Sequence, residues 1–444
     1  MYDYAHGHRF VFFHATTIHP LTRFVQQWLP VANITNASPT IIPTMAQPLP
    51  PILAFAPHPW WNHWLSRQQL LSRLGQRGWT VIYSFGPLNV WYRHTPLWQQ
   101  SPWFGWLQDS DHVRVDHPGR FPPLWPRFPR WDRWVIRHHA RRMLQGLPAN
   151  GPRPIALLFH PTFEPWLQPI QPEYVVYHVF DAYRMMENWT EDKAGMEQRL
   201  LQRADLITTS SQGMADTLPW GGNRRAKVLN NGADAQRFVA AAGVPCPVDL
   251  EAIPHPRIGY VGSINPKLDL DMVLSLAKKQ TDWHWVFIGP VYMNGSTERD
   301  ARGRQRWQEC LQQPNIHWLQ RKSLEEMPAY LNHLDVHVIC YLIARDQQGL
   351  KDDWVVHGYP TKLHECLATG RPVVAAAQQV IVAEFQHVVT VAETVSQWET
   401  AIARALEGQG TGTVAERRQV ALANTWDARV DLLERWLLDM IQLP

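Results

Sequence analysis

Short apolar segments alternate with amphipathic segments on both sides of a proline-rich stretch, and this arrangement limits the folds open to the chain. Residues 240–256 contain four prolines and have the composition of a linker. The apolar segments have the length of buried strands, and their alternation with helices is typical of parallel sheets. They lie at 52–56, 79–84, 155–159, 174–179, 205–209, 257–262, 283–288, 316–319 and 335–340, with two further ones at 380–385 and 388–391. We therefore expect an α/β protein with two Rossmann-like, doubly wound domains that face each other across a cleft.

The same pattern sets the expected domain boundaries. Residues 1–47 form a poorly patterned N-terminal extension, 48–239 a first domain, 240–256 the linker and 257–410 a second domain. Helices are expected in the remaining residues, 411–444, with a break near Asn424. A length of 444 residues agrees with two domains, because a single hydrophobic core rarely grows to that size.

Composition excludes several classes of protein. An apolar content of 45% with 18% charged residues is that of a folded globular chain. A net charge of +3 argues against a general nucleic-acid binder. No apolar run reaches the roughly 18 residues of a membrane helix, and the first residues lack a signal-peptide layout. Four cysteines and 21 histidines show no metal-binding spacing, so we expect a cytoplasmic protein with free thiols and no metal site.

The segment from His357 to 374 is the strongest candidate for a binding site. Gly358 and Pro360 interrupt any helix, Thr361 has the position of a helix start, and an apolar run follows Gly370. A loop that enters a helix presents unpaired N–H groups to an anion, and Lys362 and Glu365 in the first turns add a cation and a sugar-binding carboxylate. The simpler alternative is a capped helix with polar residues facing solvent.

This segment also resembles a known family. Its P-x-K-x-x-E turn at 360–365, followed by G-x-P-V-V at 370–374, is similar to the donor-nucleotide site of GT-B glycosyltransferases, particularly glycosyltransferase family 4. Further motifs match that family in order. They are RADLITTS at 203–210, VLNNGAD at 228–234 followed by Phe238, IGYVG at 258–262 and WDAR at 426–429. The resemblance implies a GT-B fold whose C-terminal helix crosses back onto the first domain.

The resemblance also implies a donor site in the second domain, made of Gly262, Lys267, Arg321, His357, Pro360, Thr361, Lys362 and Glu365. In the family, the glycine loop lies against the diphosphate, the lysines neutralise it, the arginine holds the base and phosphates, and the glutamate binds the ribose. Two positions depart from the family pattern. His357 replaces the glutamate that contacts the donor sugar, and Ser263 replaces an arginine next to the phosphates.

Candidates for catalysis come from strand ends in the first domain. Asp181 and His160 end neighbouring strands, and His58 follows the first strand. If the enzyme inverts the anomeric centre, one of them should deprotonate the acceptor hydroxyl, and Asp181 is preferred. If it retains the configuration, the resemblance requires no strict base. Each could instead be a polar residue that makes a local hydrogen bond.

Two other features of the sequence have both a functional and a structural interpretation. The triplets Asp109–Asp111 and Asp269–Asp271 both read D-x-D, but such triplets are frequent by chance, and the second lies at a helix start where carboxylates cap. The stretch 114–142 carries eight arginines among tryptophans and only two acids. It could be a solvated face, a nucleic-acid patch or a membrane-surface patch.

Together these observations predict a metal-independent glycosyltransferase. It would move a sugar from a nucleotide-diphosphate sugar to a hydroxyl of a sugar or lipid-linked glycan, in exopolysaccharide or surface-glycan assembly, with no cofactor and no nucleic acid. Its expected location is the cytoplasm, either free or at the inner face of the membrane. The alternatives are a GT-B nucleotide-sugar epimerase and a catalytically inactive nucleotide- or sugar-binding partner of a polysaccharide assembly.

Overall fold

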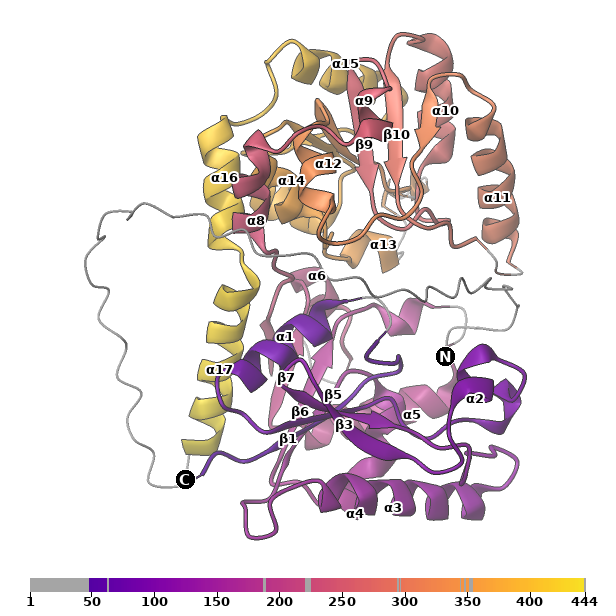
Figure 1. Ribbon diagram of the computed structural model, residues 1–444, viewed down its shortest axis with the longest axis vertical. Coiled ribbons are helices and arrows are strands. Elements are labelled where there is room, and N and C mark those ends of the chain that lie inside the picture. The colour runs from indigo at the N-terminus through magenta and orange to yellow at the C-terminus, as the bar shows by residue number, and fades with distance from the viewer. Residues whose placement is uncertain are drawn as a thin grey trace, which may run out of the picture.

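The structure of the chain is a computed structural model that describes residues 48–61, 64–186, 189–219, 225–293, 295, 297–343, 345–346, 349–350 and 354–442. The extension predicted for residues 1–47 lies outside these ranges. Two α/β halves, one above the other in Figure 1, make up the described part of the chain.

The first half is built on a mixed sheet that has eight strands in the described residues, in the order β3-β4-β2-β1-β5-β6-β7-β8. Its strands are β1 (Ile52–Phe55), β2 (Val81–Ser84), β3 (Trp106–Ser110), β4 (Val113–His117), β5 (Ile155–Leu158), β6 (Tyr174–Val179), β7 (Leu206–Thr209) and β8 (Ala226–Val228). All pairs are parallel except β3 with β4. The first strand pairs with the second in the register Ile52 to Val81, as the predicted βαβ unit requires.

Helices cover both faces of this sheet because alternate residues of its strands are apolar in both directions. Ile52 and Ala54 pack with α1, whereas Leu53 and Phe55 pack with α3 and its neighbours. The helices of this half are α1 (Ser66–Gln76), α2 (Pro96–Gln100), α3 (Pro129–Gln145), α4 (Leu167–Ile170), α5 (Glu191–Arg203) and α6 (Gln212–Asp216).

The second half has a parallel sheet whose order in the described residues is β11-β10-β9-β12-β15-β16, the doubly wound arrangement that was predicted. Its strands are β9 (Arg257–Val261), β10 (His284–Ile288), β11 (Ile316–Trp318), β12 (Val336–Ile339), β15 (Val373–Ala375) and β16 (Thr390–Val391), and a separate hairpin joins β13 (Arg345–Asp346) to β14 (Gly349–Leu350). The helices are α8 (Ala235–Ala240), α9 (Val248–Glu251), α10 (Leu270–Lys279), α11 (Glu298–Leu311), α12 (Met327–Asn332), α13 (Trp354–His357), α14 (Leu363–Thr369), α15 (Val395–Leu406), α16 (Val414–Ala423) and α17 (Trp426–Gln442).

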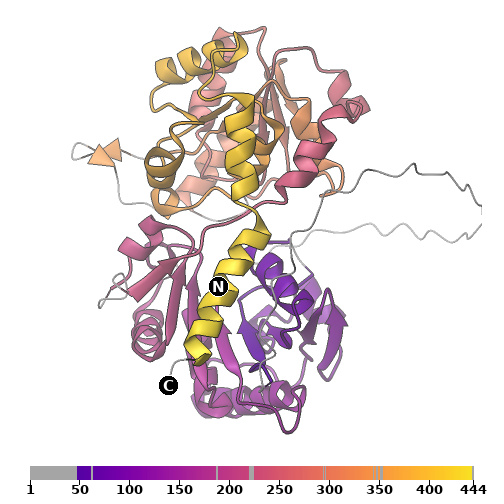
Figure 2. The same ribbon diagram turned by 90° about the vertical axis from the view of Figure 1, so that its left-hand side faces the viewer.

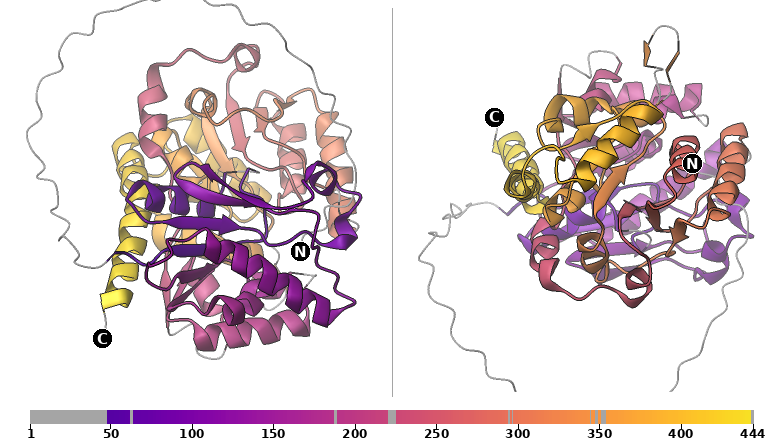
Figure 3. Two further views of the ribbon diagram at one scale, coloured as in Figure 1. Left: turned by 60° about the horizontal axis from the view of Figure 1, so that its bottom comes forward. Right: turned by 90° about the horizontal axis from the view of Figure 1, so that it is seen from above.

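These helices form two layers around the second sheet. One layer contains α10, α11 and α15, and the other contains α8, α12, α14 and α16. The view from above shows the sheet between them (Figure 3, right). Phe238 of α8 belongs to the core of this second half.

The strand expected at 380–385 is wrong. Ile381–Phe385 forms a π-helical turn, in which Ile381 and Phe385 are buried and the three residues between them are exposed. A spacing of four between buried residues is that of a helix, and the β-branched composition of the segment concealed it.

The C-terminal helix returns to the first half, as the sequence resemblance implied. It runs from α16 in the upper half down to the lower half (Figure 2). Val430, Leu433 and Leu437 of α17 are buried in the same core as β1 and α1. Arg77, directly after α1, forms ion pairs with Asp431 and Glu434 of this helix at 2.7 and 2.8 Å.

Candidate functional site

A cleft of about 990 Å³ lies between the two halves. The first half contributes the beginning of α1 and the residues after β6, and the second half contributes the loops after its strands together with the start of α14. These are the carboxyl ends of parallel strands, where open α/β sheets bind ligands. Seven of the residues predicted from the sequence line this cleft: Asp181, Gly262, Lys267, Arg321, Thr361, Lys362 and Glu365.

The floor of the cleft in the second half depends on two glycines. Gly262 and Gly289 follow β9 and β10 with φ of +133° and +147°. A Cβ atom on Gly289 would overlap the carbonyl oxygen of Gly262, and one on Gly262 would overlap the Lys362 Nζ. Glycine is therefore required at both positions for the two loops and the lysine to approach so closely.

Two lysines face this floor. The buried Lys362 donates a hydrogen bond to the Tyr260 hydroxyl at 2.8 Å, and its Nζ lies 4.1 Å from the centroid of that ring. Lys267 lies 4.8 Å from the centroid of Tyr341, whose ring is also 5.5 Å from the Lys362 Nζ. Among the described residues, neither lysine has a carboxylate within 4.0 Å. Two cations held against aromatic rings, without counter-ions, make this part of the cleft an anion site.

The charges of this cluster influence one another. Burial lowers the pKa of Lys362, and the nearby Tyr341 opposes that change. Burial would raise the pKa of Tyr341, but Lys267 and Lys362 outweigh it, so the pKa of this phenol is lowered. A bound anion would replace the stabilisation that both lysines lose by leaving water.

Glu365 lies in the same wall, three residues after Lys362 at the start of α14. Burial raises the pKa of Glu365 to about 7, although Lys362 acts in the opposite direction. Because α14 has only seven residues, the charge at this site comes from the lysines more than from the helix dipole.

Asp181 faces the cleft from the first half, directly after β6. Its Oδ1 accepts a hydrogen bond from the Ala182 N–H at 3.0 Å. Burial raises the pKa of Asp181 to about 6, against the opposing effects of this hydrogen bond and of Lys267. A carboxyl group that titrates near neutrality in a cleft is suited to proton transfer.

Four predicted site residues do not line the cleft: His58, His160, His357 and Pro360. The buried His160 caps a short helical turn by accepting the Thr162 N–H at its Nδ1. Burial lowers the pKa of His160 to about 3, so its ring stays neutral. The carbonyl of His58 accepts the Tyr83 hydroxyl at 2.5 Å.

His357 joins the two halves of the molecule. Its carbonyl oxygen accepts a hydrogen bond of 2.6 Å from the Ser211 hydroxyl, which also caps α6. Its ring Nδ1 lies 3.1 Å from the Gln379 Oε1. These contacts place His357 where the two halves meet, outside the lining of the cleft.

The sequence reasoning missed three residues that shape the cleft. Tyr260 and Tyr341 hold the lysines, and Arg67 lies at the beginning of α1. Both tyrosines stand at the ends of apolar strands. In the sequence, only their polar hydroxyl groups distinguish them from ordinary core residues. Nothing in the sequence marks Arg67 as a cleft residue, because its helix was predicted from its apolar residues alone.

The D-x-D triplets have structural roles. The Asp269 Oδ1 accepts the Met272 N–H at the start of α10, and Asp271 pairs with Arg302 and Arg306. Asp109 pairs with Arg114. Within the described ranges, no group of three or more His, Cys, Asp or Glu side chains is arranged to hold a metal ion.

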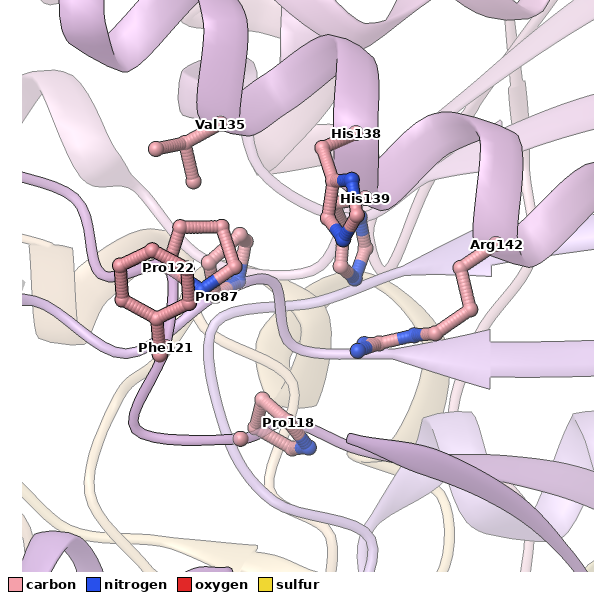
Figure 4. A pocket seen from close by; sticks show the side chains of 9 residues that line it. Pro87, Pro118, Phe121, Pro122, Val135, His138, His139 and Arg142 are labelled. Carbon is pink, nitrogen blue, oxygen red and sulfur yellow. The ribbon is translucent and has the colours of Figure 1, made fainter. Parts of the chain in front are cut away.

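A second hollow lies under α3 in the first half. His138, His139 and Arg142 project from α3 toward the loop that contains Pro118 and Phe121 (Figure 4). Its volume of about 10 Å³ is enough for about one water molecule. The Asp116 carboxylate below it accepts hydrogen bonds from His139 at 2.8 Å and Arg142 at 2.5 Å. This buried network stabilises the fold and leaves no space for a substrate.

The fold and the cleft define the class of protein. Two Rossmann-like domains that face one cleft, with a last helix that returns to the first domain, are the GT-B architecture, and the resemblance found in the sequence is confirmed. Trehalose-6-phosphate synthase OtsA matches with a TM-score of 0.62 at 13% identity, over 89% of this chain and 99% of that chain. Sucrose-phosphate synthase from Thermosynechococcus elongatus matches with a TM-score of 0.64 at 13% identity, over 88% and 99%. The Anabaena protein HepE, in complex with UDP and glucose, has a TM-score of 0.60 at 13% identity, over 87% and 98%.

Sequence comparison gives a family match for the second domain. The family described as "Glycosyl transferases group 1" matches residues 255–408. The putative teichuronic acid biosynthesis glycosyltransferase TuaH of Bacillus subtilis (strain 168) is 30% identical over 181 residues, which are 40% of this chain and 42% of that protein. The match therefore spans less than half of this relative's length.

Proposed function

We propose that the protein transfers a sugar from a nucleoside-diphosphate sugar to a hydroxyl group of an acceptor. The observation that carries this proposal is the pair Lys267 and Lys362, which face the Gly262 loop without a carboxylate partner in the described part of the cleft. A diphosphate has the negative charge that these two cations lack. The match to the group 1 glycosyltransferase family over the same domain supports this reading.

Each cleft residue then has a chemical role. The diphosphate lies against Gly262 and Gly289, and the lysines stabilise the charge that develops as the sugar leaves, so the reaction needs no metal ion. Glu365 accepts hydrogen bonds from the ribose hydroxyl groups, and Arg321 at the mouth holds the base or the phosphates. Asp181 on the opposite wall is the candidate base for the acceptor hydroxyl, and closure of the cleft would exclude water.

Calorimetry with UDP and GDP tests the donor site. We expect Lys362→Ala and Glu365→Ala each to weaken nucleotide binding by about tenfold or more, since each removes a hydrogen bond that involves a charged group. Lys279→Ala is the matched control, because Lys279 is exposed on α10 and pairs with Glu399 at 2.7 Å. Unchanged nucleotide affinity in both cleft variants would show that the site is elsewhere.

Product analysis separates the alternatives. A transferase releases nucleoside diphosphate together with a glycosylated acceptor. An epimerase forms the epimeric nucleotide sugar, or nucleotide together with the free epimeric sugar when water takes the sugar, and no acceptor product, whereas an inactive partner binds nucleotide without turnover. A screen of nucleotide sugars with crude lipid acceptors would therefore identify both the reaction class and the donor.

We also propose that the acceptor is a surface glycan assembled at the cytoplasmic face of a membrane, which the protein contacts through its first domain. The similarity to a protein of teichuronic acid biosynthesis supports the glycan assignment. The contact surface consists of one stripe of α3, namely Arg130, Arg133, Trp134, Arg137 and Arg141, and the nearby aromatic residues Trp103, Phe104, Trp125 and Phe128. We call it the arginine–tryptophan face.

The arrangement of this face supports an anionic lipid surface as the partner. At about 100° per residue, its five α3 residues fall within about 60° of one direction, opposite the buried Val135 and His139. Phe104 is 73% exposed and Trp103 is 68% exposed. Arginine attracts anionic headgroups and tryptophan prefers the interface. In Figure 1, α3 lies at the end of the first half that is farthest from the second half, and Figure 3 (left) brings this end forward.

No helix in the described part of the chain has both the length and the apolar character needed to span a membrane. Flotation with vesicles of phosphatidylglycerol and phosphatidylcholine therefore tests surface binding. Replacing Arg130, Arg133 and Arg137 by serine should abolish the dependence on anionic lipid. A triple control on exposed cations elsewhere, Lys278, Arg404 and Arg435 to serine, should preserve it. Equal loss in both triple variants would indicate a general charge effect and contradict the proposed face.

A further inference from the structure

Arg67 is a buried cation in the first half of the cleft whose charge is not balanced by the protein. Its side chain lines the cleft and the residue is only 1% exposed. The guanidinium lies 5.7 Å from the Phe180 ring centroid, and its Nε has no hydrogen-bond partner. Within the described residues, no carboxylate lies within 4.0 Å of it.

The two arginines at the other end of this helix, one in its last turn and one directly after it, have acidic partners. Arg73 contacts Asp234 at 2.5 Å and Asp427 at 3.3 Å, and Arg77 contacts Asp431 and Glu434. Removing a cation from water is costly unless an anion compensates it, so an unpaired buried arginine needs an explanation. Arg73 and Arg77 both obtain this compensation from acidic side chains.

The nearby acidic groups do not compensate the positive charge of Arg67. Asp234 and Asp427 are engaged with Arg73. The cation that acts on the pKa of Asp181 is Lys267 rather than Arg67. The phenol of Tyr83 lies beside Arg67, but burial raises its pKa to about 12 against the charge of Arg67 and a hydrogen bond with it, so this partner is neutral and does not balance the charge of the guanidinium. The compensating anion must therefore come from a ligand.

The beginning of α1 provides further donors beside Arg67. The residue before the helix is Leu65, which cannot accept a hydrogen bond from the first turn. The first intrahelical bond is made by the Gln69 N–H to the Leu65 carbonyl, and the N–H groups of Ser66 and Arg67 precede it. This 11-residue helix therefore directs unsatisfied N–H groups and its positive end into the cleft, next to the unpaired guanidinium.

We infer that Arg67 and the first turn of α1 bind an oxyanion of the acceptor, so that the acceptor is an anionic glycan or glycolipid that carries a phosphate or a carboxylate. The assignment of this oxyanion to the acceptor rests on the proposed transferase function, whereas the anion site itself does not. The site lies in the first half, across the cleft from the lysines of the donor site. The planar guanidinium can donate two parallel hydrogen bonds to a phosphate or to a carboxylate. The N–H groups in the first turn of α1 donate the remaining hydrogen bonds to the oxyanion.

Binding of three simple probes distinguishes the sources of the anion. Hexose 6-phosphate, glucuronate and glucose are titrated into the Lys362→Ala variant, in which the lysine pair of the donor site is incomplete. We expect one or both charged probes to bind about tenfold or more tightly than glucose, and Arg67→Gln in the same background to remove that preference. A response to hexose 6-phosphate alone identifies a phosphate site, and a response to glucuronate alone identifies a carboxylate site. No preference for either charged probe would overturn the inference.

Stability measurements separate a ligand-binding arginine from a structural one. If Arg67 carries an uncompensated charge, Arg67→Gln should melt at the same or a higher temperature than the parent protein in the absence of ligand. In the Lys362→Ala background, hexose 6-phosphate or glucuronate should raise the melting temperature, and Arg67→Gln should remove this response. Arg77→Gln, directly after the same helix, should melt lower and keep the response in that background. A lower melting temperature for Arg67→Gln together with an unchanged response would contradict the proposed site.

The two proposals fail in different ways. If the parent protein binds neither UDP nor GDP but binds a charged probe through Arg67, the transferase proposal fails and the anion site stands. If nucleotide binds through Lys362 and Glu365 but Arg67→Gln leaves all probes unaffected, only the acceptor inference fails. Arg67→Lys keeps the positive charge but loses the planar guanidinium, so it should retain a weakened preference for the charged probe. This variant provides the test if Arg67→Gln does not fold.

Discussion

The Nζ of Lys362 occupies the space that a side chain at Gly262 would need, so the buried cation and the glycine loop depend on each other. The lysine reaches this position because the Tyr260 hydroxyl accepts its hydrogen bond at 2.8 Å. The glycine reaches its φ of +133° only because it has no Cβ. A ligand that lies on the loop therefore also meets the lysine.

Gly262→Ala should displace the Lys362 ammonium group. Because the overlapping atom is the end of a flexible side chain, the lysine can move away, and we expect a loss of stability of only about 1–2 kcal/mol from the backbone strain. UDP affinity should fall by about tenfold or more, since the cation leaves the anion site. Calorimetry and urea unfolding measure the two effects.

Gly78→Ala is the matched control for this substitution. Gly78 also has a positive φ, +92°, but an added Cβ would meet no atom within 4 Å. It should lose a similar amount of stability and keep its affinity for UDP. Equal affinities for the two variants would contradict the link between Gly262 and Lys362.

Asp181→Asn tests the candidate base. If Asp181 deprotonates the acceptor, the substitution should lower turnover by about 100-fold or more and leave UDP affinity within about twofold. Since burial raises the pKa of Asp181 to about 6, turnover of the parent should rise with pH through about 6 and then level off. The pH profile of transfer at saturating donor measures this. Unchanged turnover in Asp181→Asn would exclude the base role and favour a retaining reaction.

The sequence was sufficient to predict the architecture and the wall of the cleft that the second half forms. The alternation of strands and helices placed both sheets, and Lys362 and Glu365 were found because they stand at fixed spacing in one continuous segment. Contacts between distant segments were not visible in this way. Tyr260 meets Lys362 across 102 residues, and Ser211 meets His357 across 146 residues.

His160 and His357 show why residue type and strand position were not enough. Both follow apolar segments in the sequence, but the direction of a side chain depends on local turns that single-sequence patterns do not resolve. The His160 ring turns back to cap its own loop, and the His357 carbonyl bonds Ser211 of the other half. Arg67 was missed because the apolar residues of α1 predict the helix but not the direction of its polar side chains, and this arginine is buried beside Phe180 of its own half.

Glu365→Gln should change how stability depends on pH. Burial raises the pKa of Glu365 from 4.5 to about 7, so the folded state binds the proton more tightly than the unfolded state. This contribution to the free energy of unfolding is fully present below pH 4.5 and is lost as pH rises through about 7, by about 3 kcal/mol at most. Glutamine has no such loss, so the variant should gain stability relative to the parent between pH 5 and pH 8. Urea unfolding at both values measures the difference.

Glu399→Gln is the control of opposite sign for this measurement. The hydrogen bond from Lys279 lowers the pKa of Glu399, so its contribution to stability is present above its ordinary pKa and is lost only as pH falls. Between pH 5 and pH 8 this variant should show no gain over the parent. A gain of the same size in both variants would mean that a global charge effect, rather than Glu365, causes the pH dependence.

Leu433→Ala should destabilise the first domain, although the residue belongs to the last helix of the chain. Leu433 is 2% exposed and packs in the core formed by β1, β2 and α1. Removing its side chain leaves a cavity that costs about 2–5 kcal/mol. Val414→Ala, at an exposed position of α16, should cost less than about 1 kcal/mol. Chemical unfolding gives both values, and protection of the β1 amides from hydrogen exchange reports the first domain directly. If Leu433→Ala lowered protection only in the second domain, α17 would not be part of the core of the first domain.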